Sequence, residues 1–175
     1  MWEGWKKRKG ILDLFAAIPQ VLAKVSNARF IIAGADNSIS DGFQAKQGCD
    51  YPTYFNQQYA AQRNKVTFLG RVDEAQLQSL YQQCHLFVAP SLYESVGLIY
   101  LEAMNYAKPV IGCRAGGVPE VVEDGVTGVL VDPGAAQELA EGAQGRLGGT
   151  AHGPLRLGPP GHAFVAGAGG AEVRY

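Results

Sequence analysis

The chain has 175 residues, a formal net charge of −1, 47% hydrophobic residues and 18% charged residues. These values are typical of one globular domain and argue against a disordered chain and a general nucleic-acid-binding surface. Cys49, Cys84 and Cys113 lack ligand-like spacing, which argues against a zinc site or disulfide framework and favours a reducing compartment. No apolar run approaches the roughly 20 residues of a membrane span, and no signal peptide begins the chain. We therefore expect a cytoplasmic protein.

Up to about residue 144, short apolar runs alternate with segments of helical spacing. Strands are expected at 29–34, 66–70, 86–90, 109–113 and 128–131, and helices at 11–25, through 59–63, after Asp73, at 97–106, at 118–123 and from about 135. Uninterrupted apolar strands separated by helices predict an α/β, doubly wound parallel sheet. Ligands of such sheets bind outside the carboxyl ends of the strands, so the site should follow Gly34, Gly70, Pro90 and Cys113.

The segment 145–175 differs from the rest in composition. It holds nine glycines and three prolines among its 31 residues and has no helical or strand period. Such a composition is not expected to hold a packed element. A flexible linker and a non-native, out-of-frame sequence both fit, and the abrupt end of the periodic pattern within a helix favours the second. We therefore expect a folded domain over 1–144 and a disordered or non-native tail over 145–175.

The densest chemical signal follows the third expected strand, where Glu94 and Glu102 lie eight residues apart. Gly97, at the turn between them, would let backbone approach a ligand closely, and the helix that follows presents free N–H groups to an anion. Carboxylates accept hydrogen bonds from hydroxyls but repel a bare phosphate. The pattern predicts a ligand that carries both a phosphate and sugar hydroxyls.

This segment resembles the E-x7-E motif of family 4 retaining glycosyltransferases (glycosyl transferases group 1), which have the GT-B fold. Further matching segments are Arg8-Lys9-Gly10, Phe68-Leu69-Gly70-Arg71-Val72, Pro90-Ser91, Lys108-Pro109-Val110-Ile111, Gly116-Gly117-Val118-Pro119-Glu120, Asp124-Gly125-Val126-Thr127-Gly128 and Val131-Asp132-Pro133. The resemblance covers roughly residues 8 to 141. It implies a Rossmann-like domain that binds a nucleotide sugar, the C-terminal half of a GT-B enzyme.

The resemblance also implies roles for individual residues. Glu94 would bind the donor sugar near its anomeric centre, Lys9 would neutralise the leaving diphosphate, and Glu102 would hold the ribose. The diphosphate and sugar would be contacted by the backbone amides of Ser95, Val96, Gly97 and Leu98. The backbone around Arg71 and Val72 would contact the base. Val96 stands where many family members carry Phe. No Asp-x-Asp pair exists in the chain, so neither a metal nor another cofactor is expected.

Simpler structural interpretations exist for several of these residues. The run Lys6-Lys7-Arg8-Lys9 can be a solvated surface, but four cations before a helix N-terminus oppose the helix dipole, which favours a phosphate partner. Glu94 can be a plain loop carboxylate and Glu102 part of a solvated helix face. Gly116-Gly117 fits a strand-to-helix turn better than a phosphate loop, because no G-x-G-x-x-G pattern is present.

The implied enzyme is a hexosyltransferase that moves a sugar from a nucleotide diphosphate sugar to an acceptor hydroxyl with retention of configuration. The family's first, central strand of this domain has no counterpart before Lys9, and no acceptor-binding domain precedes it. We therefore expect a truncated sheet with two open strand edges, prone to aggregation, and no transfer by this chain alone. The sugar or lipid-linked acceptor would bind through the missing domain, and the full-length enzyme could associate peripherally with a membrane.

Two alternatives stay open. One is a catalytically inert nucleotide-binding or partner-binding remnant. The other is a different GT-B enzyme, such as a sugar-nucleotide epimerase or a phosphorylase, although the chain offers no candidate for the cofactor lysine of a phosphorylase.

Overall fold

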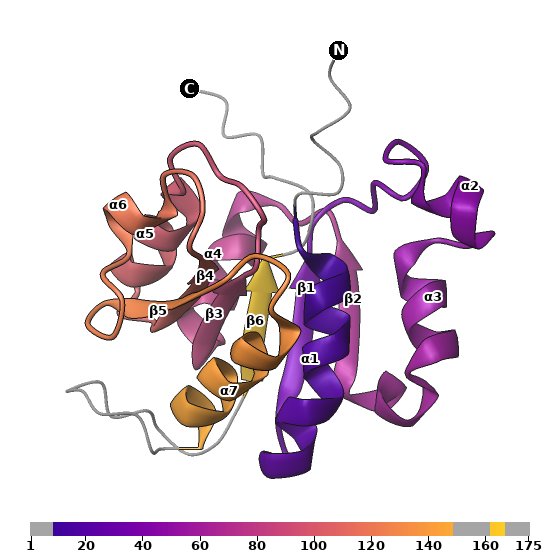
Figure 1. Ribbon diagram of the computed structural model, residues 1–175, viewed down its shortest axis with the longest axis horizontal. Coiled ribbons are helices and arrows are strands. Elements are labelled where there is room, and N and C mark those ends of the chain that lie inside the picture. Colours follow the sequence, from indigo (N-terminus) through magenta and orange to yellow (C-terminus); the bar gives the residue numbers. More distant parts are fainter. Residues whose placement is uncertain (1–8, 149–161, 167–175) are drawn as a thin grey trace.

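The computed structural model describes residues 9–148 and 162–166 (Figure 1). In chain order its elements are α1 (Ile11–Lys24), β1 (Arg29–Ala33), α2 (Phe43–Gln47), α3 (Tyr51–Gln58), the 3₁₀ helix η1 (Ala60–Lys65), β2 (Val66–Gly70), α4 (Glu74–Gln83), β3 (Leu86–Ala89), α5 (Leu98–Asn105), β4 (Val110–Cys113), α6 (Val118–Val121), β5 (Gly128–Val131), α7 (Ala136–Leu147) and β6 (His162–Ala166). No helix within these residues combines the length and the apolar character needed to cross a membrane.

The described strands form one sheet in the order β2-β1-β6-β3-β4-β5, and every neighbouring pair is parallel. The five strands and the α/β class predicted from the sequence are therefore confirmed. Because all strands run the same way, their carboxyl ends meet at one edge of the sheet, and the loops that follow β2, β3 and β4 all lie at that edge.

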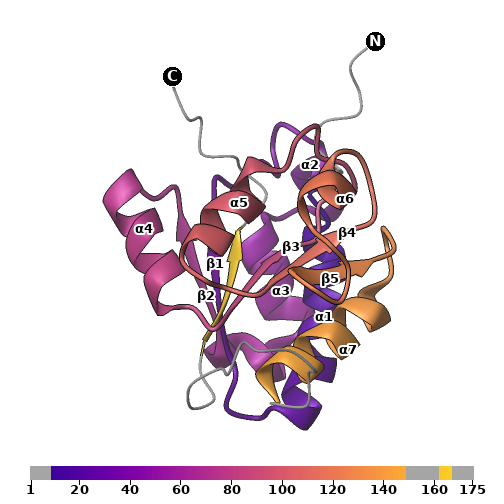
Figure 2. The ribbon, with the colours of Figure 1, turned by 90° about the vertical axis from the view of Figure 1, so that its left-hand side faces the viewer.

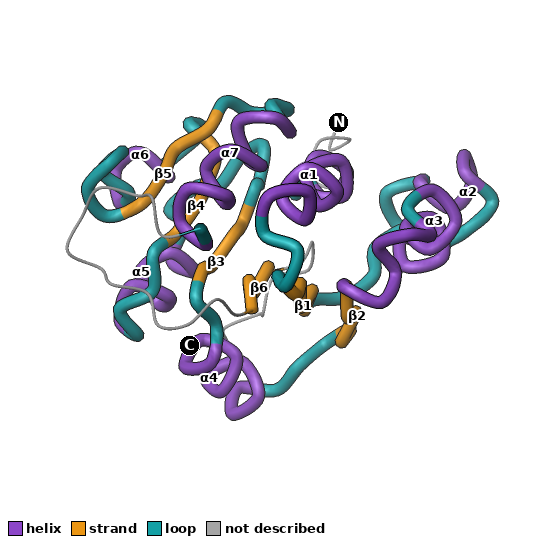
Figure 3. The backbone as a smooth tube through the Cα atoms, turned by 90° about the horizontal axis from the view of Figure 1, so that it is seen from below, coloured by secondary structure: helices purple, strands orange, loops and turns teal. Residues whose placement is uncertain are grey.

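Helices cover both faces of the sheet. In β3, Leu86 and Val88 belong to one apolar cluster, while Phe87 and Ala89 belong to another, as expected when alternate side chains point to opposite faces. The first cluster also contains residues of α1, α3 and α7, and the second contains residues of α4, α5 and α6. Figures 2 and 3 show α1 and α7 on one side of the strands and α4 on the other.

Strand β6 comes from the glycine-rich tail and lies at the centre of the sheet. Its residues pair in parallel with β1, with Ile31 opposite Phe164, and with β3, with Phe87 opposite the same residue. The expectation that this tail holds no packed element, and that β1 and β3 keep open edges, is therefore wrong at 162–166. The physical reason is local: these five residues contain neither Gly nor Pro and include Phe and Val, which favour strands. Residues 149–161 and 167–175 lie outside the described residues.

Helix α7 also extends past the expected end of the domain at residue 144. The helix continues to Leu147, which is buried, and the buried Arg146 side chain donates to the backbone oxygen of Gly128 at 3.4 Å. The Gln144 side chain donates to the backbone oxygen of Gln20 at 2.9 Å, which joins α7 to α1. Burial of these last residues outweighs the cost of about 1 kcal/mol for a glycine such as Gly145 inside a helix.

The segment between β1 and β2 also differs from prediction. Asp50 caps α3, because its side chain accepts a hydrogen bond from the Thr53 N–H at 2.8 Å. The α-helix therefore begins at Tyr51 and ends at Gln58, and the predicted helical stretch 59–63 falls largely in η1. The predicted cap at Asp73 is confirmed, since its side chain accepts from the Gln76 N–H in a complete capping box.

Candidate functional site

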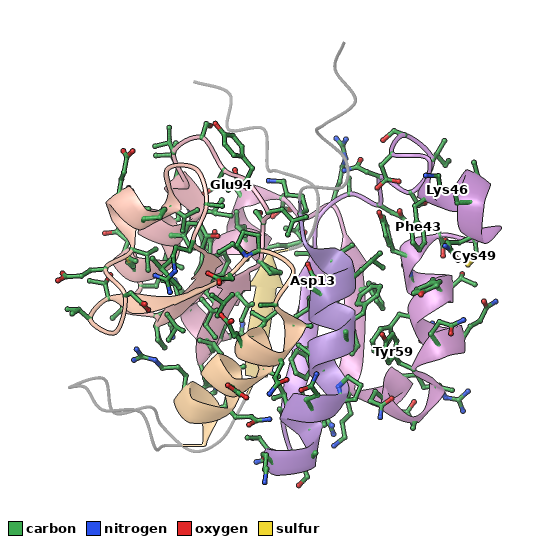
Figure 4. All side chains as sticks on the ribbon, viewed as in Figure 1. Asp13, Phe43, Lys46, Cys49, Tyr59 and Glu94 are labelled. Carbon is green, nitrogen blue, oxygen red and sulfur yellow. The ribbon has the colours of Figure 1, made fainter. Side chains whose placement is uncertain are left out.

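The site is built around the loop of residues 90–97, which joins β3 to α5 at the carboxyl edge of the sheet. Glu94 lies in this loop (Figure 4), and its Oε1 is 2.5 Å from Lys9 Nζ and 3.0 Å from the hydroxyl of Ser91. The Lys9 and Glu94 side chains are only 22% and 19% exposed. The structure therefore brings together the two residues that the sequence predicted as catalytic, although 85 positions separate them.

Gly10 lets Lys9 reach this loop. Its φ is 61°, a left-handed conformation that side chains disfavour, and a Cβ at this position would lie 1.9 Å from the backbone oxygen of Pro90. The backbone before α1 therefore packs directly against the residue that begins the motif loop. In the sequence, the signal for this contact is a glycine directly before the first helical residue.

Gly116 and Gly117 support the same loop from the other side. A Cβ on Gly116 would lie 2.0 Å from the backbone oxygen of Glu94, and one on Gly117 would lie 2.3 Å from that of Ser95. The Gly117 N–H donates to the Glu94 backbone oxygen at 2.8 Å. This pair forms the turn between β4 and α6, as predicted. Because neither glycine has a side chain, the backbone of the turn between β4 and α6 can pack directly against the backbone of the loop of residues 90–97.

Ser95, Val96, Gly97 and Leu98, the predicted amide donors, form the passage from the loop into α5. Gly97 is the N-cap of the helix with a φ of 76°, and Ser95, Val96 and Leu98 are exposed. The first amides of a helix lack intrahelical acceptors and carry the positive end of its dipole. This segment can therefore accept an anionic group next to the Lys9–Glu94 pair.

Glu102 lies in the second turn of α5, with its side chain half-buried. It lines a pocket of about 540 Å³ together with Leu98, Leu101, Met104 and Asn105. The same pocket thus contains one predicted diphosphate-binding residue and the residue predicted to hold the ribose. Lys9 contacts Glu94 at the start of the motif, and this pocket lies along the helix that follows, α5.

Tyr81 of α4 reaches across to this glutamate. Its hydroxyl donates to Glu102 Oε2 at 3.0 Å, and only 2% of the residue is exposed. Burial raises the pKa of Tyr81, and the neighbouring Glu102 carboxylate raises it further, so the phenol stays protonated and remains a donor.

Two of these contacts were missed from the sequence. They are the hydrogen bond from Tyr81 to Glu102 and the hydrogen bond from Ser91 to Glu94. The available signal was chemical, because a buried hydroxyl needs a hydrogen-bond partner.

Arg71 and Val72 lie directly after β2, at the same edge of the sheet. Arg71 is exposed, whereas Val72 is half-buried and packs against the apolar cluster that contains Tyr81 and Tyr100. A hydrogen bond from the Gly34 N–H to the Gly70 oxygen, 2.8 Å long, joins the loops after β1 and β2. The structure thus places these two residues next to the start of α4, but neither lines the Glu102 pocket as far as the described residues define it.

Asp13, in the first turn of α1, is a further half-buried carboxylate (Figure 4). Burial raises its pKa by penalising the charged form. Within residues 9–148 and 162–166, no group of three or more His, Cys, Asp and Glu side chains is arranged to hold a metal ion.

Comparison with known proteins shows the family of the chain. A family model described as glycosyl transferases group 1 matches residues 3–147. An uncharacterised glycosyltransferase of Methanocaldococcus jannaschii is 34% identical over 135 residues, which are 77% of this chain and 32% of that protein. The predicted resemblance to glycosyl transferases group 1 is confirmed, and the chain spans about a third of this relative.

Two solved structures share the fold. The Anabaena protein Alr3699/HepE, solved in complex with UDP-glucose, matches with a TM-score of 0.62 and 28% identity over 83% of this chain and 36% of that one. The C-terminal domain of a group 1 glycosyl transferase, LpcC from Francisella tularensis, matches with a TM-score of 0.61 and 26% identity over 77% of this chain and 67% of that domain. The match to a C-terminal domain agrees with the predicted half of the GT-B fold.

Proposed function

This chain belongs to the family of glycosyl transferases group 1, and we propose that it is the donor-binding half of a retaining, family 4 glycosyltransferase of the hexosyltransferase type. The whole enzyme would transfer a sugar from a nucleotide diphosphate sugar to an acceptor hydroxyl with retention of configuration. The observation that carries the proposal is the loop 90–97, which holds the Lys9–Glu94 pair at one end and leads to the Glu102 pocket at the other.

In the proposed complex, the nucleotide lies along α5. Glu102 accepts hydrogen bonds from the ribose hydroxyls, and the amides of Ser95, Val96, Gly97 and Leu98 face the diphosphate at the positive end of the helix dipole. The backbone around Arg71 and Val72 meets the base. Glu102, the amides of 95–98 and the Lys9–Glu94 pair follow one another from the pocket toward the loop of residues 90–97. One extended nucleotide sugar can therefore contact all three.

Lys9 and Glu94 act at the bond between the anomeric carbon of the sugar and the diphosphate, which breaks during transfer. Without donor the two side chains neutralise one another, and the arriving diphosphate offers Lys9 a stronger anionic partner. Lys9 then turns to the phosphate oxygens, and the freed Glu94 accepts hydrogen bonds from sugar hydroxyls near the anomeric carbon. Stabilising the charge that develops on the leaving diphosphate and positioning the sugar are the main catalytic contributions of these residues. The proposal needs no metal ion and no other cofactor.

Support for a nucleotide sugar as donor comes from the related Anabaena protein, which was solved with UDP-glucose. The family match does not favour an epimerase or a phosphorylase. An inert nucleotide-binding remnant would keep the Glu102 pocket but would not need a lysine and a glutamate paired at the motif loop.

The acceptor belongs to the remaining part of the enzyme. The chain covers only 32% of the Methanocaldococcus relative and 36% of the Anabaena protein. We therefore propose that a sugar or lipid-linked acceptor binds a domain outside this segment, and that this chain alone transfers no sugar. We further propose that the enzyme works in the cytoplasm and that its full-length form associates peripherally with the membrane surface.

Calorimetric titration tests the proposal. The chain is titrated with UDP, ADP and GDP, with the matching nucleotide sugars and with the free nucleosides. We expect at least one diphosphate to bind, its nucleoside to bind more weakly, and Glu102→Ala to weaken both nucleotide ligands. Glu141 is an exposed glutamate on α7, so Glu141→Ala is the matched control and should leave binding unchanged. Absence of binding to every nucleotide, or equal losses in both variants, would refute the proposal.

A further inference from the structure

We propose that Tyr81 is a positioning residue for nucleotide binding: its hydroxyl fixes the Glu102 carboxylate in the orientation that receives the ribose hydroxyls. The inference rests on the proposed function, because it requires that Glu102 binds the nucleotide. It adds a residue from a different helix, outside the motif, to the machinery that recognises the donor.

The contact itself joins two helices. Tyr81 lies on α4 and Glu102 on α5, and the hydroxyl donates to Oε2 at 3.0 Å across 21 positions of sequence. A carboxylate has two oxygens that accept hydrogen bonds. With Oε2 held by the tyrosine, Oε1 is the oxygen left for a ligand hydroxyl in the pocket that Glu102 lines.

The tyrosine ring is well placed to act as a fixed donor. It stacks on Tyr106 with centroids 5.7 Å apart and an interplanar angle of 19°, and it packs at a tilt against Phe87 at 5.5 Å. With 2% of its surface exposed, the side chain has little room to change rotamer. The hydroxyl therefore stays in one place whether or not a ligand is present.

The glutamate, in contrast, is a flexible side chain. A half-buried glutamate without a fixed partner samples several rotamers, and binding has to immobilise it at an entropic cost. The hydrogen bond from the Tyr81 hydroxyl orders Glu102 already in the ligand-free protein, so ligand binding does not bear this entropic cost. Its loss should weaken ribose binding about 3- to 10-fold, the range expected for immobilising one flexible side chain.

The direct test is Tyr81→Phe, which removes the hydroxyl and keeps the ring that fills the core. The probe is whichever of UDP, ADP and GDP binds the unmodified chain most tightly, titrated beside its 2′,3′-dideoxy analogue. We expect Tyr81→Phe to weaken the ribose form about 3- to 10-fold and the dideoxy form less than 2-fold. In a Glu102→Ala background, the same substitution should change neither affinity, because the group that it positions is gone.

Tyr51→Phe is the matched control. Tyr51 is also buried and donates its hydroxyl to a carboxylate, Asp41 Oδ2 at 2.5 Å, but it lies on α3. We expect it to leave the affinity for the probe unchanged. Glu102→Gln is a second variant: its amide oxygen still accepts from Tyr81, so it should bind more tightly than Glu102→Ala and should stay sensitive to Tyr81→Phe.

The outcomes distinguish the proposed ribose-binding role of Glu102 from the positioning role of Tyr81. If the unmodified chain binds no diphosphate, or binds the ribose and dideoxy forms equally, the proposed role of Glu102 fails and the inference fails with it. If the chain distinguishes the two forms but Tyr81→Phe does not change that distinction, only the positioning role is overturned. An equal loss for both probes, or a loss that persists with Glu102→Ala, would show that Tyr81 acts only through folding.

Discussion

Lys9 Nζ and Glu94 Oε1 are 2.5 Å apart, and the Ser91 hydroxyl donates to the same carboxylate oxygen. The ammonium predicted to bind phosphate is therefore held at the carboxylate predicted to bind sugar. Such a pair is preorganised: each charge is partly desolvated and has a partner, and a ligand carrying both phosphate and hydroxyls can replace both halves of it.

The first prediction concerns Lys9. Lys9→Ala should weaken nucleoside diphosphate binding by about 1.5–3 kcal/mol, the range for a hydrogen bond to a charged group, and should spare the weaker binding of the free nucleoside. Lys24→Ala, at the opposite end of α1, removes an equal charge from an exposed position and should have no effect. Calorimetry with both ligands measures this, and a loss of the same size for nucleoside and diphosphate would count against a phosphate contact.

The second prediction concerns the glycine beneath the motif loop. Gly116→Ala would place a Cβ 2.0 Å from the Glu94 backbone oxygen and would also strain a residue whose φ is 58°. Gly125→Ala meets the same kind of strain at a φ of 78°, but in open space. We expect about 1–2 kcal/mol of destabilisation for Gly125→Ala. Gly116→Ala should cost about 1–3 kcal/mol more and should also weaken diphosphate binding.

Urea unfolding of the two glycine variants gives the comparison. If they lose equal stability and both retain full diphosphate affinity, the close packing of Gly116 against the motif loop does not support the site.

The third prediction concerns β6. A chain that ends at Gly148 lacks the strand that pairs with both β1 and β3. Two inner strand edges would then be unpaired, and we expect loss of the cooperative thermal transition and aggregation. A chain that ends at Ala166 keeps the strand and should unfold like the full chain. Differential scanning calorimetry with light scattering distinguishes the cases, and a full-strength transition in the shorter chain would show that β6 does not stabilise the sheet.

Strand β6 also shows where prediction from sequence stops. The strands that flank the site were predictable because their apolar runs are local signals, and the motif was predictable because nine consecutive residues, 94–102, carry it. The central strand was not, because nothing in five residues of a glycine-rich tail indicates that they pair with β1 and β3. The contacts of Tyr81 with Glu102 and of Gly116 with Glu94 were hidden for the same reason: each joins segments whose proximity only the tertiary fold establishes.

The fourth prediction is a pH dependence of stability. The pKa of Asp124 is lowered from its ordinary value of 3.8, mainly because its carboxylate accepts a hydrogen bond from the Leu130 N–H and secondarily because of Arg114; partial burial opposes the shift. A carboxyl whose pKa is lower when folded stabilises the fold above its unfolded pKa, and this contribution is lost as the pH falls through the folded value. Asp124→Asn should therefore melt below the unmodified chain at pH 6.

The difference between the two melting temperatures should shrink as the pH falls below about 4. Thermal melts from pH 6 to pH 2.5 measure it. A difference that stays constant over this range would mean that the ionised carboxylate does not contribute to the stability of the fold.

The central claim is the division of labour between the two glutamates of the motif. Calorimetric titration of Glu94→Ala and Glu102→Ala with the same nucleoside diphosphate tests it most directly. Glu102→Ala should lose about 1.5–3 kcal/mol of binding free energy, because the ribose hydroxyls lose a charged acceptor. Glu94→Ala should bind the diphosphate as tightly as the unmodified chain or more tightly, because it releases Lys9 and removes a negative charge. Equal losses of diphosphate affinity in the two variants would contradict the account.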